Sequence, residues 1–346
     1  MRQTFLHGPG IITCEDREIP SPGAGEVLVR LTRVGVCGSD VHMFVRGHRM
    51  DAPLTIGHEG IGRIAGVGEG VPTSRMGSRV VIEPNIPCHH CPECYKGRGN
   101  VCRNKRIIGV NEPGCFADYL SLPSAFAHDL PPSVSDEDAV AIEPAAVALS
   151  ALNRAPAKPG DTIAIIGLGA IGMLLAHTAL ALGYRVLFSE LVQEKIALAE
   201  SMGAESVSGR GTPEENARLF ERAFTEAGVV SLFECAGSAD SASLAIASAP
   251  RGVDVILLGL SEEDTRFQTR FLSRKGNHII PSLIYDHPFD FRRCIHLVSR
   301  GIIRPGQVVS RSFPLEDLQE ALETAKQGKE SKIVIRISEE GKEEPS

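Results

Sequence analysis

Four cysteines stand within fifteen residues of the chain: Cys88, Cys91, Cys94 and Cys102. Four thiolates from one short segment can surround Zn²⁺ at about 2.3 Å and leave no coordination position open, so such a site shapes a loop and performs no chemistry. The C-x2-C-x2-C-x7-C spacing therefore predicts a structural zinc in a lobe that spans about residues 85–105.

Two other interpretations of these cysteines remain open. The first three spacings match an iron–sulfur run, but that run needs a cysteine and a proline where Arg98 and Gly99 stand. Disulfides would require an oxidising compartment and are typical of smaller chains. His89 and His90 lie in the same lobe, where four well-spaced thiols favour their being solvated loop residues.

A second metal site is indicated by residues that are far apart in the sequence. Cys37 lies in Val36-Cys37-Gly38-Ser39-Asp40-Val41-His42, and His58-Glu59 follows Gly57. A lone cysteine is most often a small buried side chain, and a lone histidine is most often structural. Together with Glu59 or Glu143, however, they offer the sulfur, nitrogen and oxygen ligands of a catalytic zinc with one position left for water or substrate.

A glycine-rich segment follows the apolar run Thr162–Ile166 directly: Gly167, Leu168, Gly169, Ala170, Ile171 and Gly172. In a dinucleotide-binding fingerprint the first glycine permits a tight turn, the second lets the backbone approach the pyrophosphate, and the third lets the helix lie close to the strand. The helix N-terminus then presents free N–H groups to the phosphates. Strand, glycines and helix together predict a dinucleotide site.

An acidic residue supports this prediction and selects the cofactor. Glu190 ends the second predicted strand, where a carboxylate accepts hydrogen bonds from the adenosine ribose. A 2′-phosphate would meet a like charge there, so NAD is expected and NADP is disfavoured. Lys195 is placed near the ribose or adenine, with a solvated helix face as the alternative.

The patterns that position these residues differ between two parts of the chain. Residues 1–145 contain many glycines and prolines between short apolar runs, which indicates β structure. After Asp161, short apolar runs alternate with helical patterns, which predicts a parallel sheet with helices on both faces. The expected strands are Thr162–Ile166, Arg185–Ser189, Val229–Glu234 and Val253–Leu258, and the expected helices are Ala170–Leu182, Gln193–Met202, Pro213–Ala227 and Ala239–Ala249. A helix near Leu315–Lys326 and a strand Lys332–Ile337 follow.

Length and charge limit the possible functions. The 346 residues suffice for two domains, and a net charge of −7 gives no electrostatic footprint for nucleic acid or an anionic membrane. The N-terminus shows no signal-peptide pattern, so a cytoplasmic location is expected. Thr162–Tyr184 has 23 residues without a charged side chain and could by length cross a membrane, but the fingerprint favours a buried strand and helix.

In combination these features resemble the zinc-dependent medium-chain dehydrogenases, and among them the sorbitol (polyol) and threonine dehydrogenase branch. The similar motifs occur in order along the chain: Gly35–His42, Gly57–Gly60, the four-cysteine lobe, Ile142-Glu143-Pro144 and the dinucleotide fingerprint. The resemblance implies a GroES-like β-barrel catalytic domain from residues 1–145 and 286–346, and a Rossmann NAD-binding domain from residues 146–285. It also implies two zinc ions per chain and a homodimer or homotetramer.

The same resemblance implies roles for single residues. Cys37 and His58 would bind the catalytic zinc with either Glu59 or Glu143, because the family shows both arrangements. Asp40 would hold the His58 ring, with helix capping as its alternative. Ser39 would take the proton of the substrate hydroxyl and pass it, through the nicotinamide ribose, to His42, unless His42 is an ordinary surface histidine. Hydride would go to NAD⁺.

Substrate identity is less well defined. A secondary alcohol of a polyol or sugar-derived compound is expected, with L-threonine or 2,3-butanediol as alternatives. Sorbitol-like members carry an Arg-Tyr pair where this chain has Tyr285-Asp286. Phe44 is a candidate pocket residue, with core packing as its alternative. Two other classes remain for comparison: a metal-free NADPH quinone reductase, which would lack Cys37 and His58, and a non-catalytic zinc- and NAD-binding interaction module.

Overall fold

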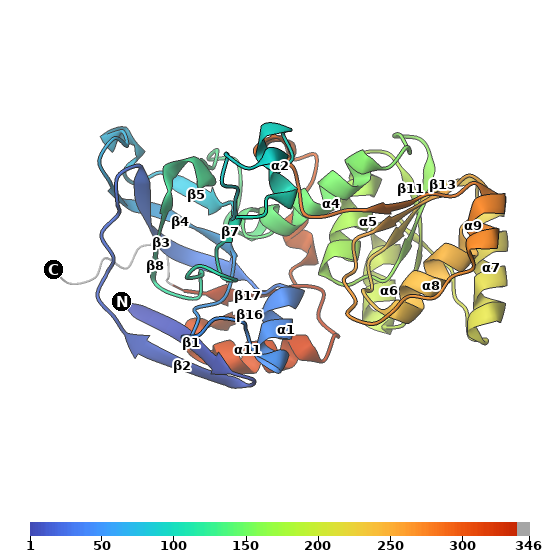
Figure 1. Ribbon diagram of the computed structural model, residues 1–346, viewed down its shortest axis with the longest axis horizontal. Helices are drawn as coiled ribbons and strands as arrows, with labels where there is room; N and C mark the ends of the chain where they lie inside the picture. Colours follow the sequence, from blue (N-terminus) through green and yellow to red (C-terminus); the bar gives the residue numbers. More distant parts are fainter. Residues whose placement is uncertain (338–346) are drawn as a thin grey trace. The chain divides into compact units, whose positions relative to one another are not determined.

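The computed structural model describes residues 1–337 and divides them into two compact units. Unit 1 contains Met1–Glu143 and the C-terminal part of the chain from His287, and unit 2 contains Pro144–Asp286. Figure 1 shows the β-rich unit 1, coloured blue to cyan and red, and the α/β unit 2, coloured green to orange. Among the helices of the described residues, none has the length and apolarity needed to cross a membrane.

Unit 1 is built around a seven-stranded sheet to which both ends of the chain contribute. The strand order is β16-β17-β3-β4-β5-β9, and β8 pairs with β3. Its strands are β3 (Glu26–Gly35), β4 (Glu59–Val67), β5 (Arg79–Ile82), β8 (Tyr119–Pro123), β9 (Ala127–Asp129), β16 (Arg311–Pro314) and β17 (Ile333–Arg336). Because β17 pairs with β3, residues near position 335 lie beside residues near position 35.

The remaining elements of unit 1 surround this sheet. They are β1 (Arg2–Gly8), β2 (Ile11–Asp16), α1 (Gly38–Arg46), β6 (Asn85–Ile86), α2 (Pro92–Tyr95), β7 (Arg106–Ile107), α3 (Asp136–Ala139), α10 (Phe289–Ser299) and α11 (Leu318–Lys326). Short 3-10 turns are η1 (Thr73–Arg75), η2 (Gly99–Val101), η3 (Ser124–Phe126), η4 (Pro305–Val308) and η5 (Leu315–Asp317). Helix α4 (Ile142–Arg154) begins in unit 1 and continues into unit 2.

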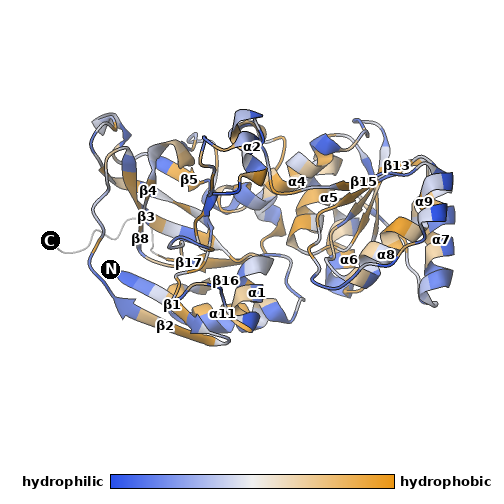
Figure 2. Cartoon of the chain, viewed as in Figure 1, coloured by the Kyte–Doolittle hydropathy of each residue, from blue (hydrophilic) through white to orange (hydrophobic). Residues whose placement is uncertain are grey.

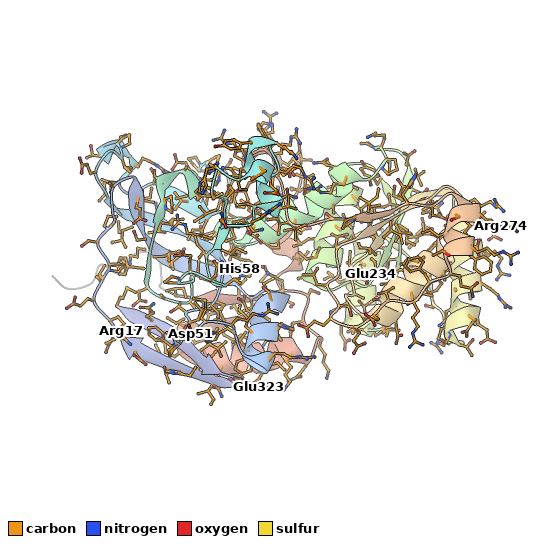
Figure 3. All side chains as sticks on the ribbon, viewed as in Figure 1. Arg17, Asp51, His58, Glu234, Arg274 and Glu323 are labelled. Atoms are coloured by element: carbon orange, nitrogen blue, oxygen red, sulfur yellow. The ribbon has the colours of Figure 1, made fainter. Side chains whose placement is uncertain are left out.

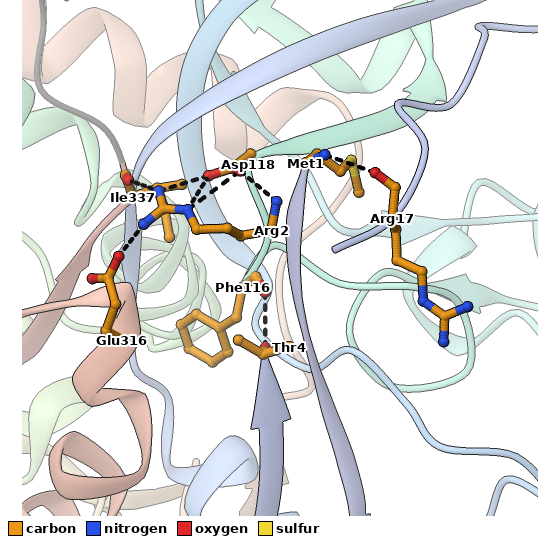
Figure 4. Close-up of polar contacts among 8 residues, drawn as sticks. All are labelled: Met1, Arg2, Thr4, Arg17, Phe116, Asp118, Glu316 and Ile337. Atoms are coloured by element: carbon orange, nitrogen blue, oxygen red, sulfur yellow. Dashed lines mark hydrogen bonds and ion pairs between the residues drawn. The ribbon is translucent and has the colours of Figure 1, made fainter. Parts of the chain in front are cut away.

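Arg2 ties the two ends of the chain together within unit 1 (Figure 4). Its guanidinium donates to Asp118 Oδ1 at 2.8 Å and to the carbonyl of Ile337 at 2.7 Å, and it forms an ion pair with Glu316. One side chain from β1 thus contacts a central loop and the C-terminal part of the chain. A planar guanidinium is suited to this because its five N–H donors point in fixed directions.

Unit 2 is a six-stranded parallel sheet in the order β12-β11-β10-β13-β14-β15. Its elements are β10 (Thr162–Ile166), α5 (Ala170–Ala181), β11 (Arg185–Ser189), α6 (Gln193–Ser201), β12 (Glu205–Ser206), α7 (Pro213–Glu226), β13 (Val229–Glu234), α8 (Ala239–Ser248), β14 (Asp254–Leu257), α9 (Thr269–Lys275) and β15 (Ile279–Pro281). Numbered along the chain, the order is 3-2-1-4-5-6, that of dinucleotide-binding sheets, with the switch point between β10 and β13. The expected parallel sheet is confirmed.

Alternating residues of β10 explain why helices cover both faces of this sheet. Ala164 and Ile166 belong to a core cluster with Phe220 and Phe224 of α7. Ile163 and Ile165 point to the opposite face and are also fully buried. Figure 2 shows the apolar colouring of the central strands and the hydrophilic outer side of α7.

A buried carboxylate anchors the chain where it returns to unit 1. Glu83 follows β5, and its Oε2 accepts hydrogen bonds from His128 Nε2 at 2.6 Å and from His287 Nδ1 at 2.8 Å. The His287 ring stacks on Phe126, and the His128 ring stacks on Phe291. Burial alone would raise the pKa of Glu83, but the two imidazoles outweigh this and lower it.

This network predicts a stability effect that depends on pH. Glu83→Gln should lower the melting temperature at pH 7 by roughly 5–10 °C, because it breaks a buried, hydrogen-bonded charge network. Since the folded pKa is depressed, the stabilisation by the native Glu83 is present at neutral pH and is lost as the pH falls below 4.5. Calorimetry of both proteins from pH 7 to pH 4 should show the difference narrowing, with the exposed Glu18→Gln as the control. A difference that stays constant with pH would contradict this assignment.

Candidate active site and cofactor sites

The four cysteines of the lobe converge on one point. They lie beside α2 and η2, and their sulfur atoms fall within 4.8 Å of one another. Cys91 Sγ is 3.5 Å from Cys94 Sγ and 3.8 Å from Cys102 Sγ, and Cys88 Sγ is 4.0 Å from Cys94 Sγ. A tetrahedron with 2.3 Å metal–sulfur bonds separates its sulfur atoms by about 3.8 Å. The four cysteines therefore fit a structural zinc ion.

Disulfide pairing in the lobe is excluded by these distances. A disulfide joins its sulfur atoms at about 2.05 Å, and all cysteines of the described chain are free thiols. A backbone hydrogen bond at His90 lowers the pKa of Cys88 to about 6, so one thiolate is available at neutral pH. The close sulfur packing also leaves little room for an iron–sulfur cluster.

The second expected group is also brought together, from two loops of unit 1. The sulfur of Cys37, a nitrogen of His58 and a carboxylate oxygen of Glu59 lie within 4.8 Å of one another. Cys37 precedes α1, and Glu59 opens β4. His58 and Glu59 are buried, and Glu59 is 1 % exposed. Figure 3 marks His58 within unit 1.

Asp40 holds the two ligand-bearing loops together. Its Oδ2 accepts a hydrogen bond from the Cys37 N–H at 2.9 Å, and its Oδ1 accepts one from the Gly57 N–H at 3.1 Å. The same Oδ1 lies 3.6 Å from His58 Nδ1, so Nδ1 faces Asp40 and Nε2 remains for a ligand bond. Asp40 therefore has both of the roles considered for it: it caps α1, and it faces the His58 ring.

The site gathers two buried carboxylates, those of Asp40 and Glu59, beside Cys37 and His58. Burial alone would lower the pKa of His58, but Asp40 and Cys37 outweigh it, and the pKa lies well above its usual value. Glu59 Oε1 is buried without a hydrogen-bond partner. Because an orphaned carboxylate oxygen in the interior is costly, the residues fit a bound divalent cation.

Lys332 is a participant that sequence reasoning missed. It is 2 % exposed, forms an ion pair with Glu59 Oε2, and donates to the carbonyl of Val36 at 3.0 Å. Burial would lower the pKa of Lys332, but Glu59 and Cys37 raise it above its usual value. A lysine immediately before an apolar strand looks like an ordinary solvated strand end, so the sequence carried no signal for this contact.

The other expected catalytic residues are placed as follows. Glu143 is buried in the first turn of α4 and is not part of the group formed by Cys37, His58 and Glu59. Its charge acts on Lys332. Ser39 and His42 are exposed, three residues apart on α1, and therefore lie on one side of the helix. Phe44 packs in the core, so it does not line a pocket.

The fingerprint glycines in unit 2 have the expected geometry. Gly167 has φ +89°, and a Cβ on Gly172 would lie 2.0 Å from the Gly167 carbonyl oxygen. A Cβ on Gly169, in contrast, would meet nothing within 4 Å. Gly169 is also the N-cap residue of α5, and because glycine has no side chain, it cannot cap the first N–H groups of the helix. Open space beside free helix N–H groups is what a pyrophosphate requires, so these residues fit a dinucleotide.

Glu190 lies directly beside this loop. Its Oε2 accepts a hydrogen bond from the Leu168 N–H at 2.6 Å, and its Oε1 accepts from the N–H groups of Leu191 and Val192. Lys195 of α6 is buried, so it does not lie on a solvated face. Ala170 and Ile171 form the first turn of α5.

Glu234 is a second carboxylate at this end of the sheet, and sequence reasoning did not single it out (Figure 3). It ends β13, and its Oε1 accepts from the N–H groups of Ala236 and Gly237 and from the hydroxyl of Ser241. It thereby fixes the turn before α8. Its position at the end of a parallel strand, like that of Glu190, was the available signal.

Comparisons with known proteins identify the family to which these features belong. Residues 23–132 match the family model of the alcohol dehydrogenase GroES-like domain, and residues 170–300 match that of the zinc-binding dehydrogenase. Sorbitol dehydrogenase of Bombyx mori is 31% identical over 342 residues, covering 96% of this chain and 97% of that protein.

Two solved structures show the same fold. A structure of a protein from E. coli CFT073, described as a short chain alcohol dehydrogenase complexed with NADH, has a TM-score of 0.89 and 28% identity, covering 97% of this chain and 99% of the other. Galactitol-1-phosphate dehydrogenase from Escherichia coli has a TM-score of 0.89 and 28% identity, covering 97% and 100%. The chain therefore belongs to the zinc-dependent medium-chain dehydrogenases, in the polyol-dehydrogenase-like branch. The expected family and fold class are confirmed.

Two fingerprint glycines are expected to respond differently to substitution, one in cofactor binding and the other in stability. Gly169→Ala should leave the melting temperature within about 2 °C of wild type, because its Cβ enters open space. It should raise the Kd for NADH by about tenfold or more, because that space is where the pyrophosphate approaches. Gly172→Ala should lower the melting temperature clearly, because its Cβ meets backbone. Calorimetry and NADH fluorescence titration measure both, and unchanged NADH binding by Gly169→Ala would contradict the proposed cradle.

Proposed function

We propose that this protein oxidises a secondary alcohol of a polyol or sugar-derived substrate to a ketone, with NAD⁺ as the hydride acceptor. The observation that carries the proposal is the group formed by the half-buried Cys37 and the buried His58 and Glu59, in which a carboxylate oxygen has no hydrogen-bond partner among the described residues. When bound there, zinc would polarise the substrate hydroxyl and lower its pKa. The quinone-reductase alternative is disfavoured, because it would lack Cys37 and His58.

The protein's own residues have distinct tasks in this proposal. Cys37, His58 and Glu59 hold the metal, and Asp40 fixes the loops that carry Cys37 and His58. Ser39 accepts the hydroxyl proton and gives up its own, which passes through the nicotinamide ribose to His42, one turn further along α1, and from there to solvent. Glu59 is preferred over Glu143 as the carboxylate ligand, since only Glu59 is in the group.

NAD is the proposed cofactor because both oxygens of Glu190 face the phosphate loop and its neighbouring strand end. A 2′-phosphate on the ribose would approach this carboxylate and be repelled. The choice rests on Glu190 alone, because one solved relative is complexed with NADH and another is bound to NADP. A cytoplasmic location is also proposed, and the family resemblance implies a homodimer or homotetramer.

The proposed substrate class is tested with a panel of polyols, sugar phosphates, 2,3-butanediol and L-threonine, each assayed for NADH formation. Galactitol 1-phosphate belongs in the panel because a relative acts on it. Polyols or their phosphates should give the highest kcat/KM. Preference for L-threonine or butanediol would replace the polyol assignment.

The matched variant in this panel is Cys37→Ser, which should lower kcat/KM at least a thousandfold, because it removes a metal ligand. Metal analysis should then find close to one zinc per chain, against two in the wild type, since the four-cysteine lobe is untouched. A non-catalytic module would show no turnover of any alcohol by the wild type. Retained turnover by Cys37→Ser would remove the metal group from the mechanism.

The cofactor preference is tested with Glu190→Ser. This variant should raise the KM for NAD⁺ by about tenfold and raise kcat/KM for NADP⁺, because the carboxylate that repels the 2′-phosphate is gone. Glu194→Ser, on the following helix, is the control and should leave both values near wild type. An unchanged ratio of NAD⁺ to NADP⁺ use in Glu190→Ser would refute the role assigned to Glu190.

A further inference from the structure

The buried lysine next to the metal group has no role in the chemistry described so far. Lys332 comes from the C-terminal part of the chain, whereas Glu59 comes from β4 near the N-terminal end. Both are almost completely buried. A buried lysine normally loses its charge or finds a partner, and Lys332 has found Glu59.

The two oxygens of Glu59 are in different situations. Among the described residues, Oε2 forms the ion pair with Lys332, whereas Oε1 has neither an ion-pair nor a hydrogen-bond partner. The carboxylate belongs at the same time to the group with Cys37 and His58. The same carboxylate thus contacts the ammonium group of Lys332 and contributes to the candidate metal group.

The position of this pair is enforced by backbone packing. Gly35 is the residue of β3 that pairs with Glu59 on one side and with Val334 on the other. A Cβ on Gly35 would lie 2.0 Å from Glu59 Oε2 and 3.0 Å from Lys332 Cε. The absence of a side chain at Gly35 thus leaves the room in which the carboxylate and the ammonium group meet. The Val36 carbonyl fixes Lys332 Nζ from the same strand end.

We propose that Lys332 is a positioning residue that keeps one oxygen of Glu59 away from the metal, so that Glu59 binds zinc through a single oxygen. A carboxylate free of Lys332 can bind a metal with both oxygens and thereby take the coordination position that the substrate hydroxyl needs. Lys332 would in this way lower the affinity for zinc and keep one coordination position of the metal open for the substrate. This inference rests on the proposed zinc-dependent function, and it goes beyond it by assigning a role to a residue that is not a ligand.

Lys332→Met tests the proposal because methionine is similar in length and carries no charge. The variant should bind zinc about tenfold more tightly in a chelator competition, because both Glu59 oxygens become available. Its kcat/KM should fall about tenfold or more with the best alcohol of the panel. In the cobalt-substituted protein, the visible absorption should weaken as the coordination number rises. A merely structural role of Lys332 would instead lower zinc affinity and turnover together.

Two further variants keep the test decisive. Lys332→Arg retains the charge and should restore most of the wild-type zinc affinity and cobalt spectrum. The double variant Glu59→Gln with Lys332→Met leaves no unpaired buried charge, so it guards against failure of Lys332→Met to fold. Compared with Glu59→Gln alone, it should show no gain in zinc affinity, because no carboxylate remains to bind through a second oxygen.

The outcomes separate this proposal from the proposed function. Zinc affinity and the cobalt spectrum need no substrate, so they test Lys332 even if every alcohol of the panel fails. Unchanged or weaker zinc binding by Lys332→Met would overturn the proposal. A gain that persists in the double variant would also overturn it, because Lys332 would then act on the metal by repulsion and not through Glu59.

Discussion

Buried negative charge at one point of unit 1 is the constraint on which the candidate active site depends. The carboxylates of Asp40 and Glu59 converge beside His58, and within the described part of the chain Glu59 Oε1 has no partner. Such a group is unfavourable in the interior unless cations are present. Lys332 supplies one positive charge from within the chain. A divalent ion would meet the remaining demand, so the electrostatics of the site favour a metal before any ligand geometry is considered.

The sheet of unit 1 explains why this charge can be concentrated so closely. Strand β3 lies between β4 and β17, so Gly35 has Glu59 on one side and Val334 on the other. Two segments that are 273 positions apart in sequence, at Glu59 and Lys332, thereby place a carboxylate and an ammonium group against the same glycine. Register in a sheet with buried faces is strongly specified, because a shift by one residue would turn these side chains to the opposite face.

Local sequence patterns predicted unit 2 well and unit 1 less well, for a physical reason. The strands Thr162–Ile166, Arg185–Ser189 and Val229–Glu234 were expected with the bounds that β10, β11 and β13 have. Parallel strands buried on both faces read as continuous apolar runs, so their limits are visible in the sequence. In unit 1, α10 was not expected, because its segment has no clear start signal; α4, which passes from unit 1 into unit 2, was not expected either.

The candidate sites show the same division. The four cysteines and the fingerprint glycines are local motifs, and the structure brings each set together as their spacing indicates. The group of Cys37, His58 and Glu59 could be expected only by combining distant motifs. The contact between Lys332 and Glu59 could not be expected at all, since it depends on the pairing of β17 with β3. Spacing in sequence reports on ligands within one loop, whereas the charge balance of a site built from both chain ends is visible only when the sheet register is known. For this reason the residue that adjusts a ligand is harder to find than the ligand itself, and Lys332 is the example in this protein.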